Sequence, residues 1–164
     1  TIAMIRDLIA LDNSSRVWVY QADRMLSDQE ADEMRDHVFT FLETWNAHQK
    51  DLLSYGNIFH HRFLVLFADE TQTGASGCSI DDSVRFITKL GEHYNVDFFD
   101  RLNYCYLEMD EVKSVSHGQL KVKYKEGEIN DESLFFDNLV KTKEEFLQGW
   151  VKPLSDSWIM KFCR

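Results

Sequence analysis

Stretches of β-branched and aromatic residues alternate along this chain with stretches whose apolar residues recur at helical spacing. The first is Arg16 to Ala22, in which Val17 and Val19 point to one side and Trp18 and Tyr20 to the other. A strand that is apolar on both sides is typical of the interior of a sheet. The pattern therefore predicts an interior strand over residues 16–22.

A long helix and a second strand are predicted next. Ser27 and Glu30 have the spacing of a capping box, which starts a helix at Asp28 that runs to about Trp45. Its apolar stripe has the 3.6-residue period and consists of Met34, Val38, Phe41, Leu42 and Trp45. Residues 58–68 then read as one long strand with an apolar second half. Together these segments predict a β-α-β unit, with the two strands as neighbours.

A polar turn over residues 70–77 leads to a second predicted helix, capped by Ser79 and Asp82. Residues 102–107 form a third strand candidate, followed by a turn at residues 110–113. Residues 117–126 fit a strand and a helix almost equally; the cap pair Ser116 and Gln119, with Gly127 at the end, favours the helix.

The last elements are a short strand at residues 134–136 and a helix that Thr142 and Glu145 cap and Pro153 stops. The predicted fold class is α/β or α+β. We expect a single domain over residues 1–164 with a β-α-β-α start and a central sheet of about three to five strands flanked by helices. Residues 1–14 would be a lead-in, and residues 151–164 a C-terminal tail that packs on the domain.

Composition narrows the possible functions. Among 164 residues, 28 are acidic and 18 basic, so the net charge of −10 opposes binding to nucleic acid. With 44% hydrophobic residues the chain can form a core, which excludes disorder as its main state. The longest apolar run, residues 63–68, is too short to insert in a membrane. Three cysteines make neither a disulfide framework nor a zinc site, which suits the cytoplasm. We expect no cofactor and no metal.

Four segments carry a resemblance to a known family. They are SRVWVYQADR at residues 15–24, ASGCSIDDSV at 75–84, VDFFDR at 96–101 and FDNLVKTK at 136–143. In these segments the chain resembles an uncharacterised family of small proteins from Bacteroidota, whose members are often labelled "ABC transporter ATPase". The resemblance covers most of the chain.

The residues do not support the activity in that label. An ATPase of this class needs a phosphate loop, G-x-x-x-x-G-K-[ST], whose amides and lysine hold the phosphates. The nearest segment, Gly74 to Ser79, has no lysine after Gly77. SHGQ at residues 116–119 is one residue from the SGGQ core of the transporter signature but has no phosphate loop to act on. We therefore expect no genuine ABC ATPase activity.

Cys78 is the strongest candidate for a catalytic residue. It lies just before the predicted helix start at Ser79, where free amides and the helix dipole stabilise a thiolate. His60 or His61 could supply the base, although both precede the end of their strand by several residues. The alternative is that Cys78 only packs where the turn meets the helix. Asp97 and Asp100 could hold a cation beside Asp81 and Asp82, but two aspartates that flank paired phenylalanines are typical of a solvated turn around a buried anchor.

A ligand pocket is expected where strands end, at their carboxyl edge. The candidate ligand-binding residues at that edge are Gln21, Asp23, Arg24, Asp69, Glu70, Ser76, Gly77, Ser79 and Asp81. They would meet there if the strands over residues 16–22 and 58–68 are parallel. The alternative is that Arg24 pairs with Asp69 or Glu70 at a solvated rim.

The sequence therefore favours a non-catalytic binding or interaction protein, because no complete catalytic set can be assembled. Its partner would be another protein or a small molecule of unknown identity. Two alternatives stay open: a thiol-dependent enzyme built on Cys78, and an anion-binding module that uses the amides of residues 77–79.

Overall fold

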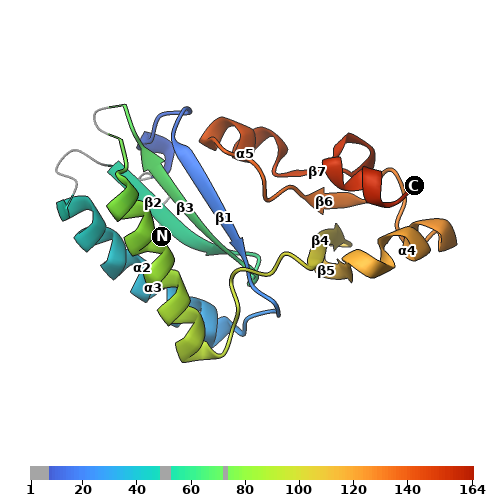
Figure 1. The fold of residues 1–164 in the computed structure, drawn as a ribbon, viewed down its shortest axis with the longest axis horizontal. Coiled ribbons are helices and arrows are strands. Elements are labelled where there is room, and N and C mark those ends of the chain that lie inside the picture. The colour runs from blue at the N-terminus through green and yellow to red at the C-terminus, as the bar shows by residue number, and fades with distance from the viewer. Residues whose placement is uncertain (1–7, 49–52, 72–73) are drawn as a thin grey trace.

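Two antiparallel sheets organise the chain. The computed structural model describes residues 8–48, 53–71 and 74–164 (Figure 1). The first sheet has the order β1-β3-β2 and consists of β1 (Arg16–Gln21), β2 (Leu53–Phe59) and β3 (Phe63–Asp69). The second sheet has the order β5-β4-β6-β7 and consists of β4 (Asn103–Glu108), β5 (Glu111–Ser116), β6 (Leu134–Phe136) and β7 (Val151–Pro153).

The helices of the described residues are α2 (Asp28–His48), α3 (Gly77–Tyr94), α4 (Leu120–Glu126) and α5 (Lys143–Gly149), with three short 3-10 helices at His117–Gln119, Leu154–Asp156 and Trp158–Phe162. This architecture is a single-domain α+β fold, one of the two classes expected from the sequence. None of the helices in the described part of the chain is long and apolar enough to span a bilayer.

The strand predicted at residues 58–68 is a hairpin. β2 ends at Phe59 and β3 begins at Phe63, with His60 and His61 both in the left-handed region at φ 55° and 53°. Two consecutive left-handed residues suit the twist of a hairpin, but such positions usually hold Asn or Gly. Two histidines give no such signal, so the apolar pattern continues through the turn. The chain therefore starts β-α-β-β-α instead of β-α-β-α.

β3 is the central strand of the first sheet and is buried along its whole length. α2 and α3 cover one face of this sheet (Figure 1). In the predicted stripe of α2, Met34, Val38, Leu42 and Trp45 are buried. Phe41 is only partly buried because it lies between the helices, where its ring stacks on Phe86 at a centroid distance of 4.4 Å.

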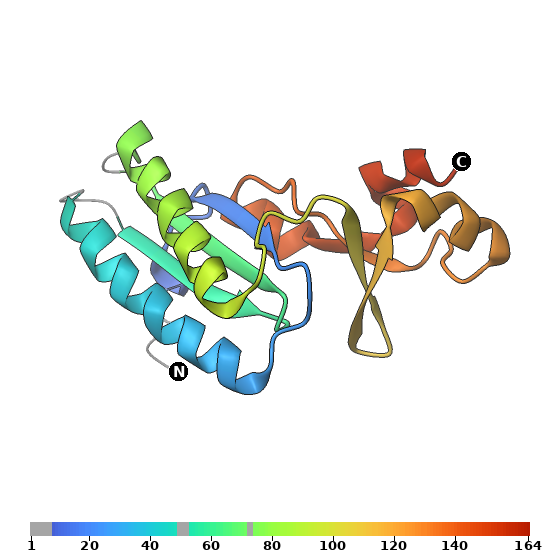
Figure 2. The ribbon, with the colours of Figure 1, turned by 60° about the horizontal axis from the view of Figure 1, so that its bottom comes forward.

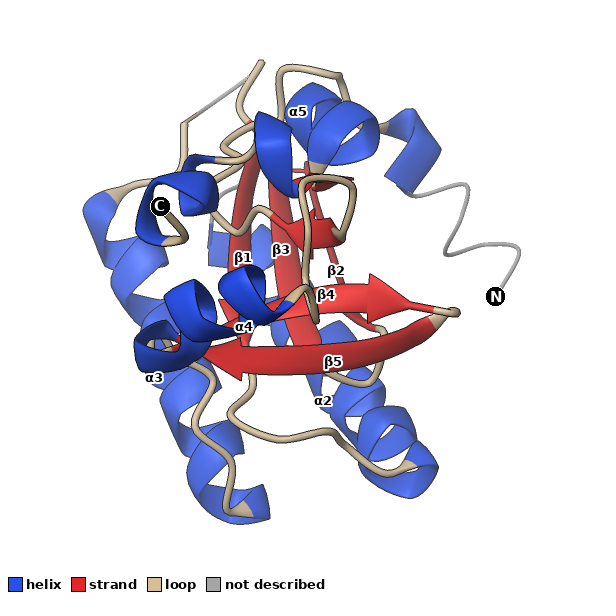
Figure 3. Cartoon of the chain, turned by 90° about the vertical axis from the view of Figure 1, so that its right-hand side faces the viewer, coloured by secondary structure: helices blue, strands red, loops and turns tan. Residues whose placement is uncertain are grey.

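The opposite face of the first sheet packs against the C-terminal half of the chain. Phe63 contacts the rings of Phe136 and Trp150 at centroid distances of 4.6 and 5.0 Å. Figure 3 shows that the strands of the second sheet cross those of the first. The neighbouring pair β1 and β3 is confirmed, but β1 lies at an edge and not in the interior. Both its faces are covered, which is why its side chains look like those of an interior strand.

A third apolar cluster lies on the far side of the second sheet, where α4 and the C-terminal segment cover it (Figure 2). Leu120, Ile129 and Leu154 are fully buried there. The helix favoured at residues 117–126 is present and ends at Gly127, which has φ 81°. The turn expected at 110–113 is wrong: Met109 and Asp110 form it, both at positive φ, and β5 follows directly.

Gly91 provides a test of how closely α3 meets the segment after it. A Cβ on Gly91 would lie 2.4 Å from the carbonyl oxygen of Val96, whereas a Cβ on Gly77 meets nothing within 4 Å. We expect Gly91→Ala to lower the free energy of unfolding by about 1–3 kcal/mol through overpacking. Gly77→Ala should leave it unchanged or raise it by about 0.5 kcal/mol. Urea unfolding measures both, and equal midpoints would contradict this close approach.

Candidate functional site

The residues predicted to share one sheet edge lie at two opposite ends. β1 and β3 are antiparallel, so the end of β1 that leads to Asp23 and Arg24 lies beside the start of β3. The end of β3 that leads to Asp69 and Glu70 lies beside the start of β1. A six-residue strand, about 17 Å long at roughly 3.3 Å per residue, separates them. The expected parallel arrangement is therefore wrong, and the nine candidates do not form one pocket.

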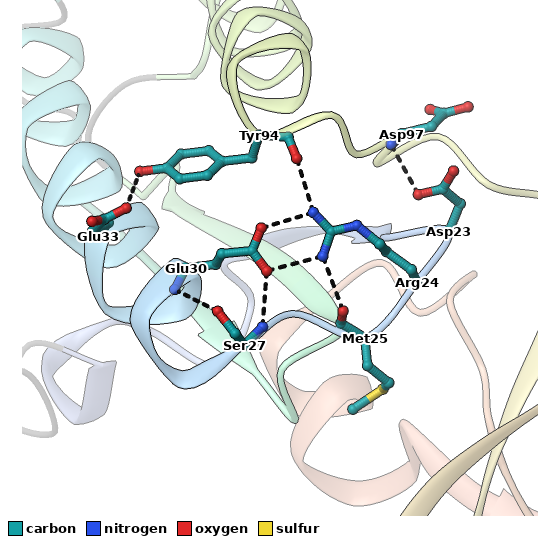
Figure 4. Close-up of polar contacts among 8 residues, drawn as sticks. All are labelled: Asp23, Arg24, Met25, Ser27, Glu30, Glu33, Tyr94 and Asp97. Carbon is teal, nitrogen blue, oxygen red and sulfur yellow. Dashed lines mark hydrogen bonds and ion pairs between the residues drawn. The ribbon is translucent and has the colours of Figure 1, made fainter.

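Arg24 holds the first sheet to both long helices. Its guanidinium donates to the two carboxylate oxygens of Glu30 at 2.9 and 2.7 Å and to the carbonyl oxygen of Tyr94 at 2.8 Å (Figure 4). Glu30 also accepts from the backbone N–H of Ser27, which completes the predicted capping box. Arg24 is thus occupied within the fold, and it pairs with neither Asp69 nor Glu70.

Glu30 makes this contact dependent on pH. Hydrogen bonds from Arg24 and Ser27 lower the pKa of Glu30 to about 2. A depressed folded-state pKa stabilises the protein above pH 4.5, and this stabilisation is lost as the pH falls towards 2. Because Arg24 is partly exposed, we expect Glu30→Gln to cost only about 1 kcal/mol at pH 7 and almost nothing near pH 2. Thermal unfolding across this pH range measures the difference, with Asp36→Asn, an exposed carboxylate of the same helix, as the control. A cost that does not change with pH would contradict this assignment.

Asp23 belongs to a turn contact. Its carboxylate accepts from the backbone N–H of Asp97 at 3.1 Å, and its own N–H donates to the carbonyl oxygen of Asp97 at 2.9 Å (Figure 4). Asp97 in turn accepts from the N–H of Phe99. Both aspartates border a shallow hollow of about 330 Å³ beside the end of α3. Their carboxylates cap the loop that leads to β4, as the solvated-turn interpretation predicted.

Asp69 is buried at the other end of the sheet. Burial alone would raise the pKa of its carboxyl, but hydrogen bonds from Thr71 and from the backbone N–H of Asp12 lower it. The ammonium of Lys143, also buried, donates to the carbonyl oxygen of Leu11 at 2.7 Å. These contacts fix the chain before β1 and after β3.

The start of α3 is capped by its own residues. The helix begins at Gly77, two residues before the predicted start, with Ser76 as N-cap. The hydroxyl of Ser76 accepts from the N–H of Ser79 at 3.1 Å. Glu70 lies near this end as well and pairs with Arg16 at 3.3 Å. A hydroxyl and a carboxylate thus already meet this helix end, so nothing here favours an anion site.

Cys78 and Asp81 are exposed in the first turns of α3. The interpretation that Cys78 packs between turn and helix is therefore wrong. No base reaches it from His60 or His61, because their turn lies at the start of β3 and α3 follows the end of β3. His61 instead hydrogen-bonds to Asp28 at 2.7 Å. The structure gives Cys78 an accessible thiol, and neither His60 nor His61 is placed to act as its base.

The three cysteines differ strongly in access. Cys105 and Cys163 are buried, and burial raises the pKa of Cys105 to about 12. We expect iodoacetamide to label only Cys78 in the native protein at neutral pH, because the thiolate is the nucleophile. Peptide mass spectrometry measures the labelling, and all three cysteines should react once urea unfolds the chain. Native labelling of Cys105 as fast as that of Cys78 would contradict the buried assignment.

A cleft of about 720 Å³ runs along the outer edge of β1, and we call it the edge cleft. One wall comes from α3, through Ile80 and Val84, together with Phe98 and Phe99. The connector from α3 to β4 passes beside the end of β1, where Gln21 and Phe99 form an isolated bridge.

The other wall of the edge cleft comes from the C-terminal half, through Leu139, Val140, Tyr104 and Trp158. Leu139 is 61% exposed. Burial raises the pKa of Tyr104. The cleft therefore has a strand edge as its floor and two largely apolar walls, and its volume suits a small-molecule or peptide ligand.

Gln21 anchors the inner end of the edge cleft. It is 3% exposed, and its amide oxygen accepts from Asn138 at 3.0 Å while its amide nitrogen donates to the carbonyl oxygen of Asn103 at 2.9 Å. Asn138 also accepts from the indole N–H of Trp150 at 3.2 Å. This chain of hydrogen bonds joins β1, β4 and the segment after β6, so the cleft is built on a fixed polar frame.

The charges in the edge cleft differ from the acidic balance of the whole chain. Arg101 and Lys141 line it, and the side chain of neither is paired with another described residue. The third charged residue, Asp100, is occupied by Asn103 and by the backbone N–H of Leu102. The charges left available to a ligand are therefore positive.

Of the nine predicted ligand residues, Gln21 alone lines the edge cleft. The lining residues at 98–101 and 138–141 could not be found from periodicity, because apolar residues in loops give no periodic signal. One signal was available: all four segments that carry the resemblance, at residues 15–24, 75–84, 96–101 and 136–143, supply residues of the cleft.

No group of three or more His, Cys, Asp or Glu residues within the described ranges could hold a metal ion. Comparison with protein families, with curated proteins and with solved structures found no match to this chain. Because no similar protein indicates a function, the edge cleft is the structural feature that bears on it.

Proposed function

We propose that this chain is a non-catalytic binding protein that holds a partly apolar ligand in the edge cleft. The observation that carries this proposal is a cleft of about 720 Å³ whose walls are apolar and whose floor is a fixed strand edge. Clefts of this size and lining are the usual place of ligands in proteins. Val84, Phe99 and Leu139 lie in it with 38%, 37% and 61% of their surface exposed, so a ligand can cover them.

The chemistry of the lining favours binding over catalysis. Of the described residues that line the cleft, none is a cysteine, serine or histidine, so it lacks the Ser–His and Cys–His pairs of nucleophilic catalysis. The alternative, a thiol-dependent enzyme, would act at Cys78, which is exposed but does not line this cleft. A binding role therefore uses the edge cleft, and an enzyme on Cys78 would not.

Two matched leucines test the proposal. Leu139 and Leu147 are 61% and 59% exposed, and only Leu139 lines the edge cleft. We expect 1-anilinonaphthalene-8-sulfonate to bind the native protein saturably, since it combines apolar rings with an anion. Leu139→Asp should weaken this binding by about tenfold, which corresponds to roughly 1.4 kcal/mol, because it places a charge in the apolar wall.

Val84→Asp, on the opposite wall, should have the same effect, and Leu147→Asp should bind the dye like the unchanged chain. Fluorescence titration measures all four proteins, and urea unfolding confirms that each is folded. Equal affinities in the cleft variants and the control would refute the edge cleft as the binding site.

A further inference from the structure

The floor of the edge cleft is a strand edge with open hydrogen-bonding positions. On the outer side of β1, the N–H of Val17 donates to the carbonyl oxygen of Lys141 at 3.0 Å, and the carbonyl of Gln21 accepts from the N–H of Asp100 at 3.3 Å. In an antiparallel ladder, alternate residues direct their backbone groups to the same side. Val19 therefore directs both its N–H and its carbonyl to this outer side, away from β3.

The backbone groups of Val17 and Val19 that face away from β3 leave a short row of open hydrogen-bonding positions. Among the described residues, no backbone group is bonded to the outer side of Val19, and the carbonyl of Val17 is likewise open. Along the strand, the open groups are therefore the carbonyl of Val17, the N–H of Val19 and the carbonyl of Val19: an acceptor, a donor and an acceptor. Isolated bridges from Arg16 to Thr142 and from Gln21 to Phe99 close the edge at both ends. The open stretch between Val17 and Gln21 is about 13 Å long, room for about three paired residues.

This pattern distinguishes between kinds of apolar ligand. An alkyl chain in the cleft would remove water from three backbone groups and offer them no partner, which is unfavourable. The main chain of an extended peptide presents N–H and carbonyl groups at the matching spacing, as in strand addition to a sheet edge. Its alternate side chains would face the two apolar walls.

The charges of Arg101 and Lys141, unpaired among the described residues, add a second requirement for the ligand, namely a negative charge. Arg101 and Lys141 line the cleft, while the one carboxylate there, Asp100, is engaged by neighbouring groups. In a chain with a net charge of −10, this is a local positive site. A carboxylate on the ligand would complement it.

We propose that the ligand of the edge cleft is an extended peptide segment that pairs about three residues with Val17 and Val19 and places an acidic side chain near Arg101 and Lys141. This inference rests on the proposed binding function and names its ligand class. The peptide enters and leaves through the mouth of the cleft, because the two bridges close the strand edge itself.

The test uses the full chain labelled with ¹⁵N and followed by NMR. Three capped pentapeptides, in which glutamate alternates with valine, leucine or phenylalanine, are the probes. In the free protein, the Val19 amide should exchange its hydrogen faster than the amides of Trp18 and Tyr20, which face β3. At least one probe should bind and slow this exchange by about tenfold or more, as a new hydrogen bond requires.

Three changes should then each weaken binding about tenfold. The first is methylation of the central peptide nitrogen, the second is lysine in place of glutamate in the probe, and the third is Val19→Pro. Proline is tolerated on an edge strand where its missing N–H faces outward, so the last variant should fold. The double variant Arg101→Glu and Lys141→Glu repeats the test if Val19→Pro does not fold, with Lys121→Glu on α4 as its control.

The outcomes separate this inference from the proposed function. If decanoate shifts the cleft resonances and none of the peptides does, or if N-methylation has no effect, the peptide assignment is refuted while ligand binding in the cleft stands. If neither the peptides nor decanoate nor the dye binds there, both are refuted.

Discussion

The burial of β3 on both of its faces is the constraint on which the rest of the structure depends. All seven of its residues are buried, and a strand of this kind needs an apolar layer on each side. α2 and α3 supply one layer, and α5 with the second sheet supplies the other. The C-terminal half is therefore no appendage, since it covers a face of the first sheet that would otherwise be exposed to water.

The same constraint produces the edge cleft. The second half of the chain has to cross from α3 to the opposite face of the first sheet, and it passes β1 twice, at residues 97–100 and again at 140–143. Each passage forms only a short bridge to β1. Gln21, tied to Asn103 and Asn138, fixes the distance between the passages. The gap along β1 is thus held open by partly buried hydrogen bonds, which fix its shape.

This arrangement also limits how the exposed strand edge can pair with another chain. A long, flat edge invites pairing with another chain, whereas short stretches and recessed positions prevent it. The open part of β1 is limited by bridges at both ends and lies between walls, so only a narrow extended segment fits. The edge cleft therefore combines a general hydrogen-bonding surface with restricted access, which is how selectivity for a ligand can arise.

The sequence by itself determined the elements whose signals are local. The capping box at Ser27 and Glu30, the Thr142 cap and the apolar stripe of α2 all depend on neighbours within one helix, and the structure has them as predicted. The turn at His60 and His61 was missed because its residues carry no turn signal. Only the tertiary structure decided the direction of β3 against β1, and with it which ends of the strands meet. That direction follows from the turn at His60 and His61, which reverses β3 against β2, and from the place of β3 between β2 and β1, which no local pattern records. It separated Asp23 and Arg24 from Asp69 and Glu70, and it assembled the edge cleft from loops that lie far apart in the sequence.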